Sequence, residues 1–369
     1  MSAARIEALY RLRVDPQHAL QRARQLAVEQ SIEMPPEAVA DPRVLAEVLA
    51  EVEHVEPQGD GTCLARLRLA CETVGDDAGQ LMNMLFGNCA LQPDVELLDV
   101  DVPAQMAQVF GGPNLGVAGW RRLTGAYGRP LTCTALKPVG STPAQLAALC
   151  RAFAQAGIDV IKDDHGWAEQ RCAPFAERVA ACQGAIDATR SRPGGRPLYA
   201  PRLSGTLPQL PRQVDLARAA GVRAFVIAPL LCGAATFNAL KRANPDLAFM
   251  AHPAFAGGRI AAPALLGRLL RLFGADAVIF PNHGGRFSYD APTCRGIAAN
   301  CRAPWQALAP ALPVPAGGMS VERVPELKRE YGNDSMLLIG GGLLSAGERL
   351  AERSRAFVAA VADVDEVAA

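Results

Sequence analysis

Apolar and polar positions change their pattern near residue 131. From there on, short apolar runs rich in β-branched residues alternate eight times with stretches in which apolar residues recur every three or four positions. The helical spacing is clear in residues 143–156 and 264–273. The predicted strands are residues 131–137, 159–164, 198–204, 224–231, 247–253, 277–283, 314–318 and 335–341.

These predicted strands are almost continuously apolar, which is typical of parallel strands covered by helices on both faces. Eight strand–helix units in about 230 residues match a (β/α)8 TIM barrel, in which active sites lie at the C-terminal ends of the strands. An open, doubly wound sheet is the alternative arrangement of the same units. The pattern predicts an α/β fold whose C-terminal part is the barrel.

The first 125 residues follow a different pattern. Residues 6–14 and 62–70 alternate as antiparallel strands do, whereas residues 16–29 and 77–84 have helical spacing. A segment rich in glycine and turn residues follows at residues 110–127. We therefore predict a small α+β domain over residues 1–125 and the barrel over residues 126–369.

Composition narrows the range of partners and compartments. Lys+Arg and Asp+Glu balance at 37 each, so no net field attracts nucleic acid or an anionic membrane, and any affinity for anions has to be local. The N-terminus has no signal-peptide core, and no apolar run of about 18 residues predicts a membrane span. The ten cysteines form no CxxC motif, which favours buried free thiols. We expect a cytoplasmic protein that binds neither nucleic acid nor membranes.

Charged and basic residues gather where the predicted strands end. The second strand runs into Lys162-Asp163-Asp164-His165, the first ends in Lys137, and the fifth and sixth end in His252 and His283. Three of five histidines and two of four lysines therefore lie at one rim of the barrel. Each residue alone could be a solvated strand end or a bridge between loops. Their convergence predicts an active site.

The cluster at residues 162–165 has three possible uses. Lys162 could neutralise a neighbouring aspartate as a structural ion pair, or it could act as a base if burial lowers its pKa. Alternatively, Asp164 and His165 could bind a divalent metal, which Lys162 can join only as an anionic carbamate. Strand alternation places Lys162 and Asp164 on the same face, so these two can share a ligand.

Glycines close the last two predicted strands. Gly317 and Gly318 end the seventh strand, and Gly340 and Gly341 end the eighth. Glycine lets backbone N–H groups approach a phosphate closely, and the loops after strands seven and eight are the usual phosphate site of this barrel. Turn formation alone is the simpler interpretation. We predict a phosphate site here.

Several of these motifs together resemble the large subunit of ribulose-1,5-bisphosphate carboxylase/oxygenase (RuBisCO). The similarity is strongest to non-carboxylating RuBisCO-like proteins of the short 5-methylthioribulose-1-phosphate isomerase type, and it extends over nearly the whole chain. The matching segments are residues 128–138, the metal-binding strand at 157–164, the phosphate loops at 315–319 and 338–342, and residues 86–88.

The resemblance implies a role for each matching residue. Lys162 would be carbamylated and would bind Mg²⁺ with Asp164 and His165. Lys137, Lys162, His252 and His283 would be catalytic. Asn88 and Glu29 would reach the neighbouring active site of a homodimer. The residues that would bind substrate or its phosphate are Asn88, Arg286, Gly317, Gly318, Gly340 and Gly341.

Three departures from the carboxylases change the expected activity. His165 stands where carboxylases have a metal-binding glutamate, so the all-oxygen shell of Mg²⁺ is altered. Val139 replaces the second lysine of the first-strand motif, and residues 284–290 lack the lysine that orients carbon dioxide. Fixation of carbon dioxide is therefore not expected.

The retained residues would enolise a phosphorylated ketose. The resemblance implies an isomerase that acts by proton transfer on 5-methylthioribulose 1-phosphate, in sulfur metabolism of the methionine-salvage type. One alternative is decarboxylation of a phosphorylated 3-oxo sugar acid, such as 3-oxo-isoapionate 4-phosphate. Others are the 2,3-diketo-5-methylthiopentyl-1-phosphate enolase reaction and a binding protein without activity.

Overall fold

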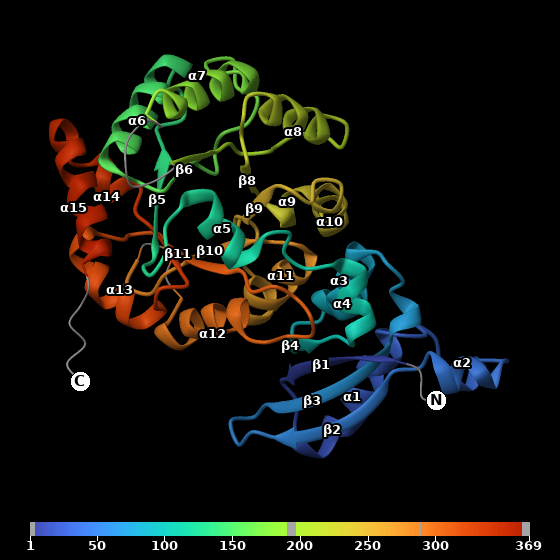
Figure 1. Cartoon of the computed structure of the whole chain (residues 1–369). Coiled ribbons are helices and arrows are strands. Elements are labelled where there is room, and N and C mark those ends of the chain that lie inside the picture. Colours follow the sequence, from blue (N-terminus) through green and yellow to red (C-terminus); the bar gives the residue numbers. More distant parts are fainter. Residues whose placement is uncertain (1–3, 190–196, 286, 288, 364–369) are drawn as a thin grey trace.

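An antiparallel four-stranded sheet forms the N-terminal part of the protein (Figure 1). The computed structural model describes residues 4–189, 197–285, 287 and 289–363. The strand order is β2-β3-β1-β4. The strands are β1 (Arg5–Leu12), β2 (Glu51–Pro57), β3 (Cys63–Ala70) and β4 (Val95–Asp101), and the helices are α1 (Ala19–Glu29), α2 (Pro42–Glu47), α3 (Ala78–Phe86) and α4 (Ala104–Phe110).

The predicted strands and helices of this region are confirmed as β1, β3, α1 and α3, but β2 and β4 were not predicted. β2 is an edge strand with no fully buried residue, and its glutamates Glu51, Glu53 and Glu56 face solvent. Charged edge strands of this kind prevent further pairing, and they carry no apolar face by which a sequence pattern could reveal them.

All eight predicted barrel strands are present. They form two parallel ladders, β12-β5-β6-β7 and β8-β9-β10-β11. The backbone bond from Leu203 N to Val226 O (2.8 Å) joins β7 to β8, and β11 packs against β12. The alternative open sheet is thus wrong. The strands are β5 (Leu131–Leu136), β6 (Val160–Asp163), β7 (Leu198–Ala200), β8 (Ala224–Ile227), β9 (Ala248–Ala251), β10 (Ala277–Pro281), β11 (Leu312–Ala316) and β12 (Met336–Leu338).

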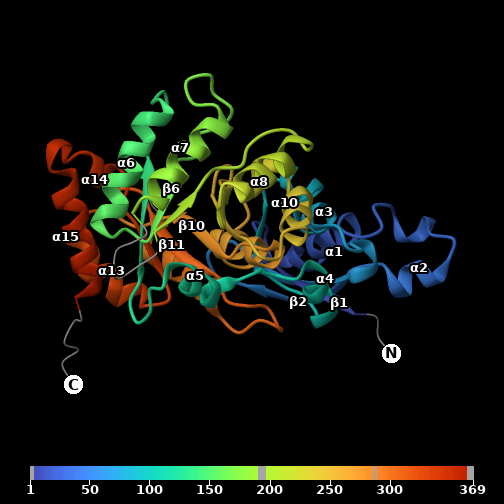
Figure 2. The same ribbon diagram turned by 45° about the horizontal axis from the view of Figure 1, so that its top comes forward.

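Helices surround this barrel, and the N-terminal sheet lies beside it (Figures 1 and 2). The two parts join where Leu97 of β4 bonds to the segment after β9, with Leu97 N 2.9 Å from Arg259 O. The helical segments are α6 (Pro143–Ala156), α7 (Phe175–Asp187), α8 (Gln209–Ala219), α9 (Pro229–Cys232), α10 (Ala234–Arg242), the π-helix η5 (Pro263–Leu269), α11 (Leu270–Phe273), α12 (Ala291–Arg302), α13 (Val324–Tyr331), α14 (Gly341–Leu344) and α15 (Leu350–Ala362).

The interior of the barrel fills with alternate residues of each strand. Helix α5 (Gly116–Thr124) closes the N-terminal end, where Val117 and Trp120 pack among these residues. Because side chains alternate along a strand, the interior position Val160 puts Lys162 and Asp164 inside as well, and Asp163 outside. The strand residues of this interior cluster are Leu131, Cys133, Val160, Leu198, Ala200, Ala224, Val226, Ala248, Met250, Ala277, Ile279, Leu312, Val314, Ala316, Met336 and Leu338.

Two further expectations concern the whole chain. All ten cysteines are free thiols in the structure, as predicted, and seven of them are buried. Within the described ranges, no helix has both the length and the apolar character that a membrane span requires.

Candidate active site

Lys137, Lys162 and Asp164 meet at the C-terminal ends of the adjacent strands β5 and β6. Lys137 Nζ lies 2.6 Å from Asp164 Oδ2, and Lys162 Nζ lies 3.5 Å from Asp164 Oδ1. Lys162 also donates to the carbonyl of Asp163 at 3.0 Å. The Lys162 side chain is almost fully buried, whereas Lys137 remains partly accessible. The predicted convergence of these three side chains is thus present.

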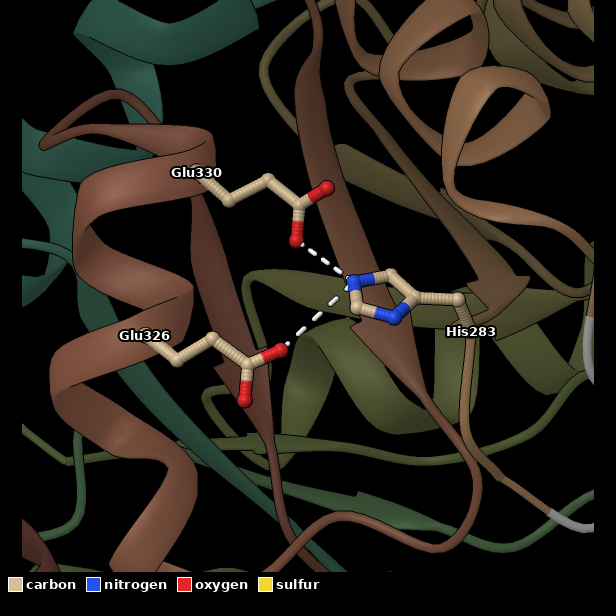
Figure 3. Close-up of side chains that lie close together, drawn as sticks. All are labelled: His283, Glu326 and Glu330. Carbon is tan, nitrogen blue, oxygen red and sulfur yellow. Dashed lines mark hydrogen bonds and ion pairs between the residues drawn. The ribbon is translucent and has the colours of Figure 1, made fainter.

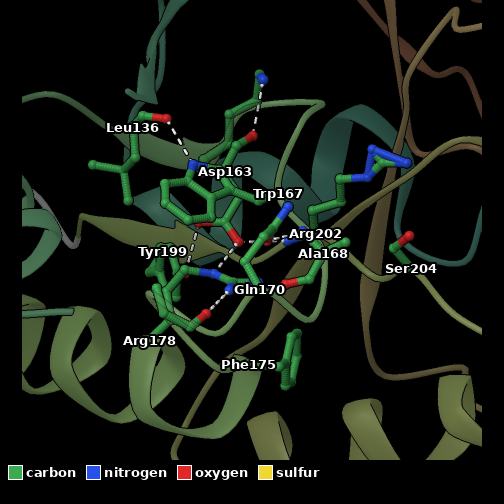
Figure 4. A network of polar contacts seen from close by, with 12 residues as sticks. Leu136, Asp163, Trp167, Ala168, Gln170, Phe175, Arg178, Tyr199, Arg202 and Ser204 are labelled. Carbon is green, nitrogen blue, oxygen red and sulfur yellow. Dashed lines mark hydrogen bonds and ion pairs between the residues drawn. The ribbon is translucent and has the colours of Figure 1, made fainter. Parts of the chain in front are cut away.

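The two neighbouring aspartates have different surroundings. The carboxylate of Asp163 faces away from the barrel interior and accepts three bonds, from Arg178 Nε (3.0 Å), Tyr199 OH (2.8 Å) and the backbone N of Arg202 (3.0 Å). Figure 4 shows these donors converging on Asp163. Its negative charge is therefore already compensated, whereas Asp164 faces the two lysines of the mouth.

Burial and charge act in opposite directions on this group. Burial lowers the pKa of the Lys162 ammonium, and the negative charge of Asp164 opposes part of that effect. Burial also tends to raise the pKa of Asp164. The charges of Lys162 and Lys137 outweigh it, so the pKa of this carboxyl lies well below its usual value. The site therefore holds an ionised carboxylate beside a lysine that loses its proton more easily than usual.

Two histidines continue the group toward β9. The rings of His165 and His252 stack with centroids 5.2 Å apart, and His165 Nδ1 lies 3.6 Å from Asp164 Oδ2. Burial first, and then the charge of Lys162, lower the pKa of His252 to about 3, so its ring is neutral at pH 7. His252 Nδ1 accepts a bond from Ala254 N at 3.1 Å. The proton of the neutral ring therefore resides on Nε2, from which it can be donated.

His283 follows β10 but points toward helix α13 (Figure 3). Its Nε2 lies 2.6 Å from Glu330 Oε2 and 3.7 Å from Glu326 Oε1. Among the described residues, no contact joins His283 to Lys137, Lys162 or Asp164. The structure thus brings four of the five basic and histidine positions of the rim into one group and leaves His283 beside it.

The glycines after β11 and β12 border the same mouth. A Cβ built on Gly340 would lie 3.7 Å from Lys137 Cε, whereas among the described residues, apart from the chain neighbours, no atom lies within 4 Å of one built on Gly317 or Gly341. Gly317 and Gly318 have φ angles of +83° and +70°, which L side chains rarely adopt. Gly317, Gly318 and Gly341 are exposed, so a ligand can approach the backbone at this end of the barrel.

Two predicted residues lie elsewhere. Asn88 is on the N-terminal domain, where its Nδ2 donates to Glu29 Oε1 at 2.8 Å; the two predicted interface residues thus contact each other. Arg286 lies outside the described residues.

Lys162, Asp164 and His165 fit Mg²⁺ only under one condition. A lysine ammonium has no lone pair to offer, so the present donors are one carboxylate and one imidazole. Mg²⁺ prefers oxygen ligands, and a carbamate on Lys162 would add two anionic oxygens. The lowered pKa of Lys162 favours the neutral amine that reacts with carbon dioxide. The residues therefore fit the ion when Lys162 is carbamylated.

A second group also has metal-ligand character. The ligand atoms of His283, Glu326 and Glu330 lie within 4.8 Å of one another. Both carboxylates already have cationic partners: Arg323 bonds Glu326 at 2.7 and 3.0 Å, and Arg295 lies 3.6 Å from Glu330. The group is compensated by arginines and does not require an ion.

Two polar residues, one at the mouth and one beside it, were not predicted. Glu330 lies on α13, 47 residues from its partner His283, and no local pattern connects them. Arg202 follows β7 and donates to the carbonyl of His165. Its inward position could have been predicted from strand alternation, because Arg202 lies two residues after Ala200 and four after Leu198, which both face the barrel interior.

Known proteins match most of this chain. Residues 116–357 match the family model described as ribulose bisphosphate carboxylase large chain, catalytic domain. The chain belongs to the RuBisCO large-chain family. The predicted resemblance is thereby confirmed, and with it the fold of this family member: an antiparallel α+β domain followed by a TIM barrel.

Three relatives illustrate the range within the family. A protein of Rhodospirillum rubrum named 5-methylthioribulose-1-phosphate isomerase is 51% identical over 97% of this chain and 96% of that protein. A 2,3-diketo-5-methylthiopentyl-1-phosphate enolase of Geobacillus thermodenitrificans is 31% identical over 80% of this chain and 75% of its own. The crystal structure of a Rubisco-like protein from Rhodopseudomonas palustris has a TM-score of 0.92 at 46% identity, over 98% of this chain and 99% of that one.

Proposed function

We propose that this protein is a non-carboxylating isomerase of 5-methylthioribulose 1-phosphate, acting by enolisation in cytoplasmic sulfur metabolism of the methionine-salvage type. The observation that carries this proposal is the 51% identity, over nearly the full length of both chains, to a protein with that name. The grouped Lys137, Lys162 and Asp164 support it, because a ketose isomerase has to remove and return a proton beside a carbonyl.

The proposed chemistry starts at C3, whose proton is acidified by the neighbouring C2 carbonyl of the ketose. Lys162, whose pKa is lowered by burial, is positioned as the base in its amine or carbamate form. His252 donates its Nε2–H to the carbonyl oxygen on which negative charge develops, as a neutral imidazole does in other enolising sites. Lys137 returns a proton from the opposite side of Asp164.

The phosphate would bind at the end of the barrel formed by β11 and β12. Gly317, Gly318 and Gly341 are exposed there and Gly340 is partly exposed, so a phosphate can approach their backbone N–H groups. We propose that Arg286 and His283 complete this site when the phosphate binds. His283 would then turn from Glu330 or keep that partner while its Nδ1 faces the substrate.

Lys162 as a carbamate, Asp164 and His165 are the residues that would hold Mg²⁺. The ion would supply Lewis-acid stabilisation of the enediolate oxygens. Carbamylation is measurable without turnover: after incubation with ¹³C-bicarbonate and Mg²⁺, a carbamate carbon signal should appear in the wild-type NMR spectrum and be missing for Lys162→Met. A spectrum without that signal in the wild type contradicts the carbamate.

A homodimer is proposed for the active assembly. Asn88 and Glu29 lie on the N-terminal domain and contact each other rather than the lysine group of the same chain. A two-fold dimer in which each N-terminal domain covers the partner's barrel mouth would bring Asn88 to the substrate. We also propose that the N-terminal domain comprises residues 1–125 and the barrel residues 126–369.

Phosphorus NMR distinguishes the candidate activities. The protein is incubated separately with 5-methylthioribulose 1-phosphate, with 2,3-diketo-5-methylthiopentyl 1-phosphate and with 3-oxo-isoapionate 4-phosphate. We expect a new phosphate resonance only from the first. The 31% identity to an enolase keeps the second as an alternative, and release of carbon dioxide from the third would favour a decarboxylase. A protein that converts none of them but binds a phosphorylated ligand would instead be a binding protein.

A further inference from the structure

Arg202 is a buried arginine that forms no ion pair with any carboxylate of the described residues. It follows β7 in phase with Leu198 and Ala200, which line the barrel interior, and it is 6% exposed. Within the described part of the chain, its guanidinium forms no ion pair. One nitrogen donates to the carbonyl of His165, and the buried Nε has no hydrogen-bond partner. A buried charge without a counter-charge is strongly unfavourable unless a ligand compensates it.

Arg178 provides a contrast within the same network (Figure 4). It too is buried, and one of its nitrogens also lacks a partner. Its charge, however, is compensated by Asp163 at 3.0 Å, and it stacks on Trp167 with 5.2 Å between its Cζ and the ring centroid. Asp163 therefore compensates the charge of Arg178. Arg202 bonds that carboxylate through its backbone N and not through its guanidinium. Arg178 has a structural explanation that Arg202 lacks.

The guanidinium of Arg202 belongs to the barrel mouth. Its hydrogen-bond acceptor is the carbonyl of His165, the residue whose ring stacks on His252 with centroids 5.2 Å apart. In the ring of strands, β7 lies opposite β11, and the predicted phosphate loops follow β11 and β12. A substrate anchored there by its phosphate would extend its carbonyl carbons across the mouth, toward the side of Lys162, His252 and Arg202.

We propose that Arg202 is a catalytic residue that binds the enediolate oxygen of the reacting ketose. The inference rests on the proposed isomerase function. When the base removes the C3 proton, the C–H electron pair forms the C2–C3 double bond and the C2 carbonyl oxygen becomes negative. Returning the proton to C2, while the C3 hydroxyl loses its own to the former carbonyl oxygen, moves the carbonyl to C3. Arg202 compensates the negative charge between these steps.

Two phosphorylated probes separate this role from phosphate binding. The alditol 5-methylthioribitol 1-phosphate keeps the phosphate but has no negative oxygen at C2, whereas phosphoglycolohydroxamate mimics the enediolate. Calorimetric Kd values are compared for the wild type, Arg202→Met, Arg202→Lys and the distant control Arg223→Met. We expect Arg202→Met to weaken binding of the hydroxamate by about 100-fold and that of the alditol by less than about threefold.

The other outcomes are equally decisive. If Arg202→Met binds both probes as the wild type does, or weakens both equally, Arg202 acts only through the loop at His165 and the inference is wrong. Arg202→Lys keeps a charge and tests the role if the methionine variant fails to fold; its kcat should fall while KM changes little. If the wild type binds neither probe and converts no ketose phosphate, the proposed function itself fails.

Discussion

Replacing Asp163 by Asn should destabilise the protein far more than replacing its neighbour Asp164. The Asp163 and Arg178 side chains are both fully buried, and the carboxylate accepts bonds at 2.8 to 3.0 Å from three donors. Leaving a buried arginine without its counter-charge costs about 3–5 kcal/mol. With an unfolding entropy of about 2.1 cal/mol/K per residue over 369 residues, the loss corresponds to a Tm decrease of about 4–6 °C.

Replacing Asp164 should affect activity more than stability. Its partners are Lys137, which is partly exposed, and Lys162, whose pKa is already lowered by burial. Asp164→Asn should therefore lower Tm by less than half as much as Asp163→Asn. It should reduce kcat by about 100-fold, because the carboxylate positions both proposed proton-transfer lysines. Differential scanning calorimetry at pH 7 and an isomerase assay measure the two effects. If the Tm of Asp163→Asn lies within about 1 °C of the wild type, or if Asp164→Asn loses more Tm than Asp163→Asn does, the buried pair of Asp163 and Arg178 does not have the stabilising role described.

Three further predictions address other parts of the site. The folded pKa of His252, about 3, lies below its unfolded value, so stability should decrease as pH falls from about 6.5 toward 3; His252→Gln should flatten this slope of Tm against pH. A Cβ at Gly342 would lie 2.7 Å from a carbonyl oxygen of the loop after β11, so Gly342→Ala should raise the KM for the ketose phosphate. Gly184→Ala on α7 is the control and should leave KM unchanged, because among the described residues its Cβ meets nothing within 4 Å. Mixing inactive Asn88→Ala and Lys162→Met subunits should restore about a quarter of wild-type activity, since half the random dimers would contain one intact site; no recovery would contradict shared sites.

The barrel was predictable because each strand is short, apolar and followed by a helix. Alternation then placed Lys162 and Asp164 on one face, and the structure confirms their contact. The structural role of Asp163 was not predictable, because its partners Arg178 and Tyr199 lie 15 and 36 residues away and contact it only in the folded chain. The orientation of His283 toward α13 depends on tertiary contacts in the same way.

β2 and Arg202 escaped prediction for different reasons. β2 has no buried face, so burial periodicity gives no signal. Arg202 does share the inward phase of β7, but arginine at a strand end is usually solvated, and its burial could be recognised only once the loop at His165 was in place. Sequence patterns thus located the rim of the mouth, whereas long-range contacts decide which charges at that rim are compensated.

Solvent-deuterium incorporation tests the central claim, enolisation of a phosphorylated ketose at the lysine group, most directly. The protein is incubated in D₂O with 5-methylthioribulose 1-phosphate, and the recovered sugar phosphates are analysed by proton and phosphorus NMR. We predict deuterium on carbons beside the carbonyl with wild-type protein, and a loss of about 100-fold or more in the exchange rate for Lys162→Ala. Wild-type protein that exchanges no carbon-bound hydrogen, or a Lys162→Ala variant that exchanges at the wild-type rate, would contradict it.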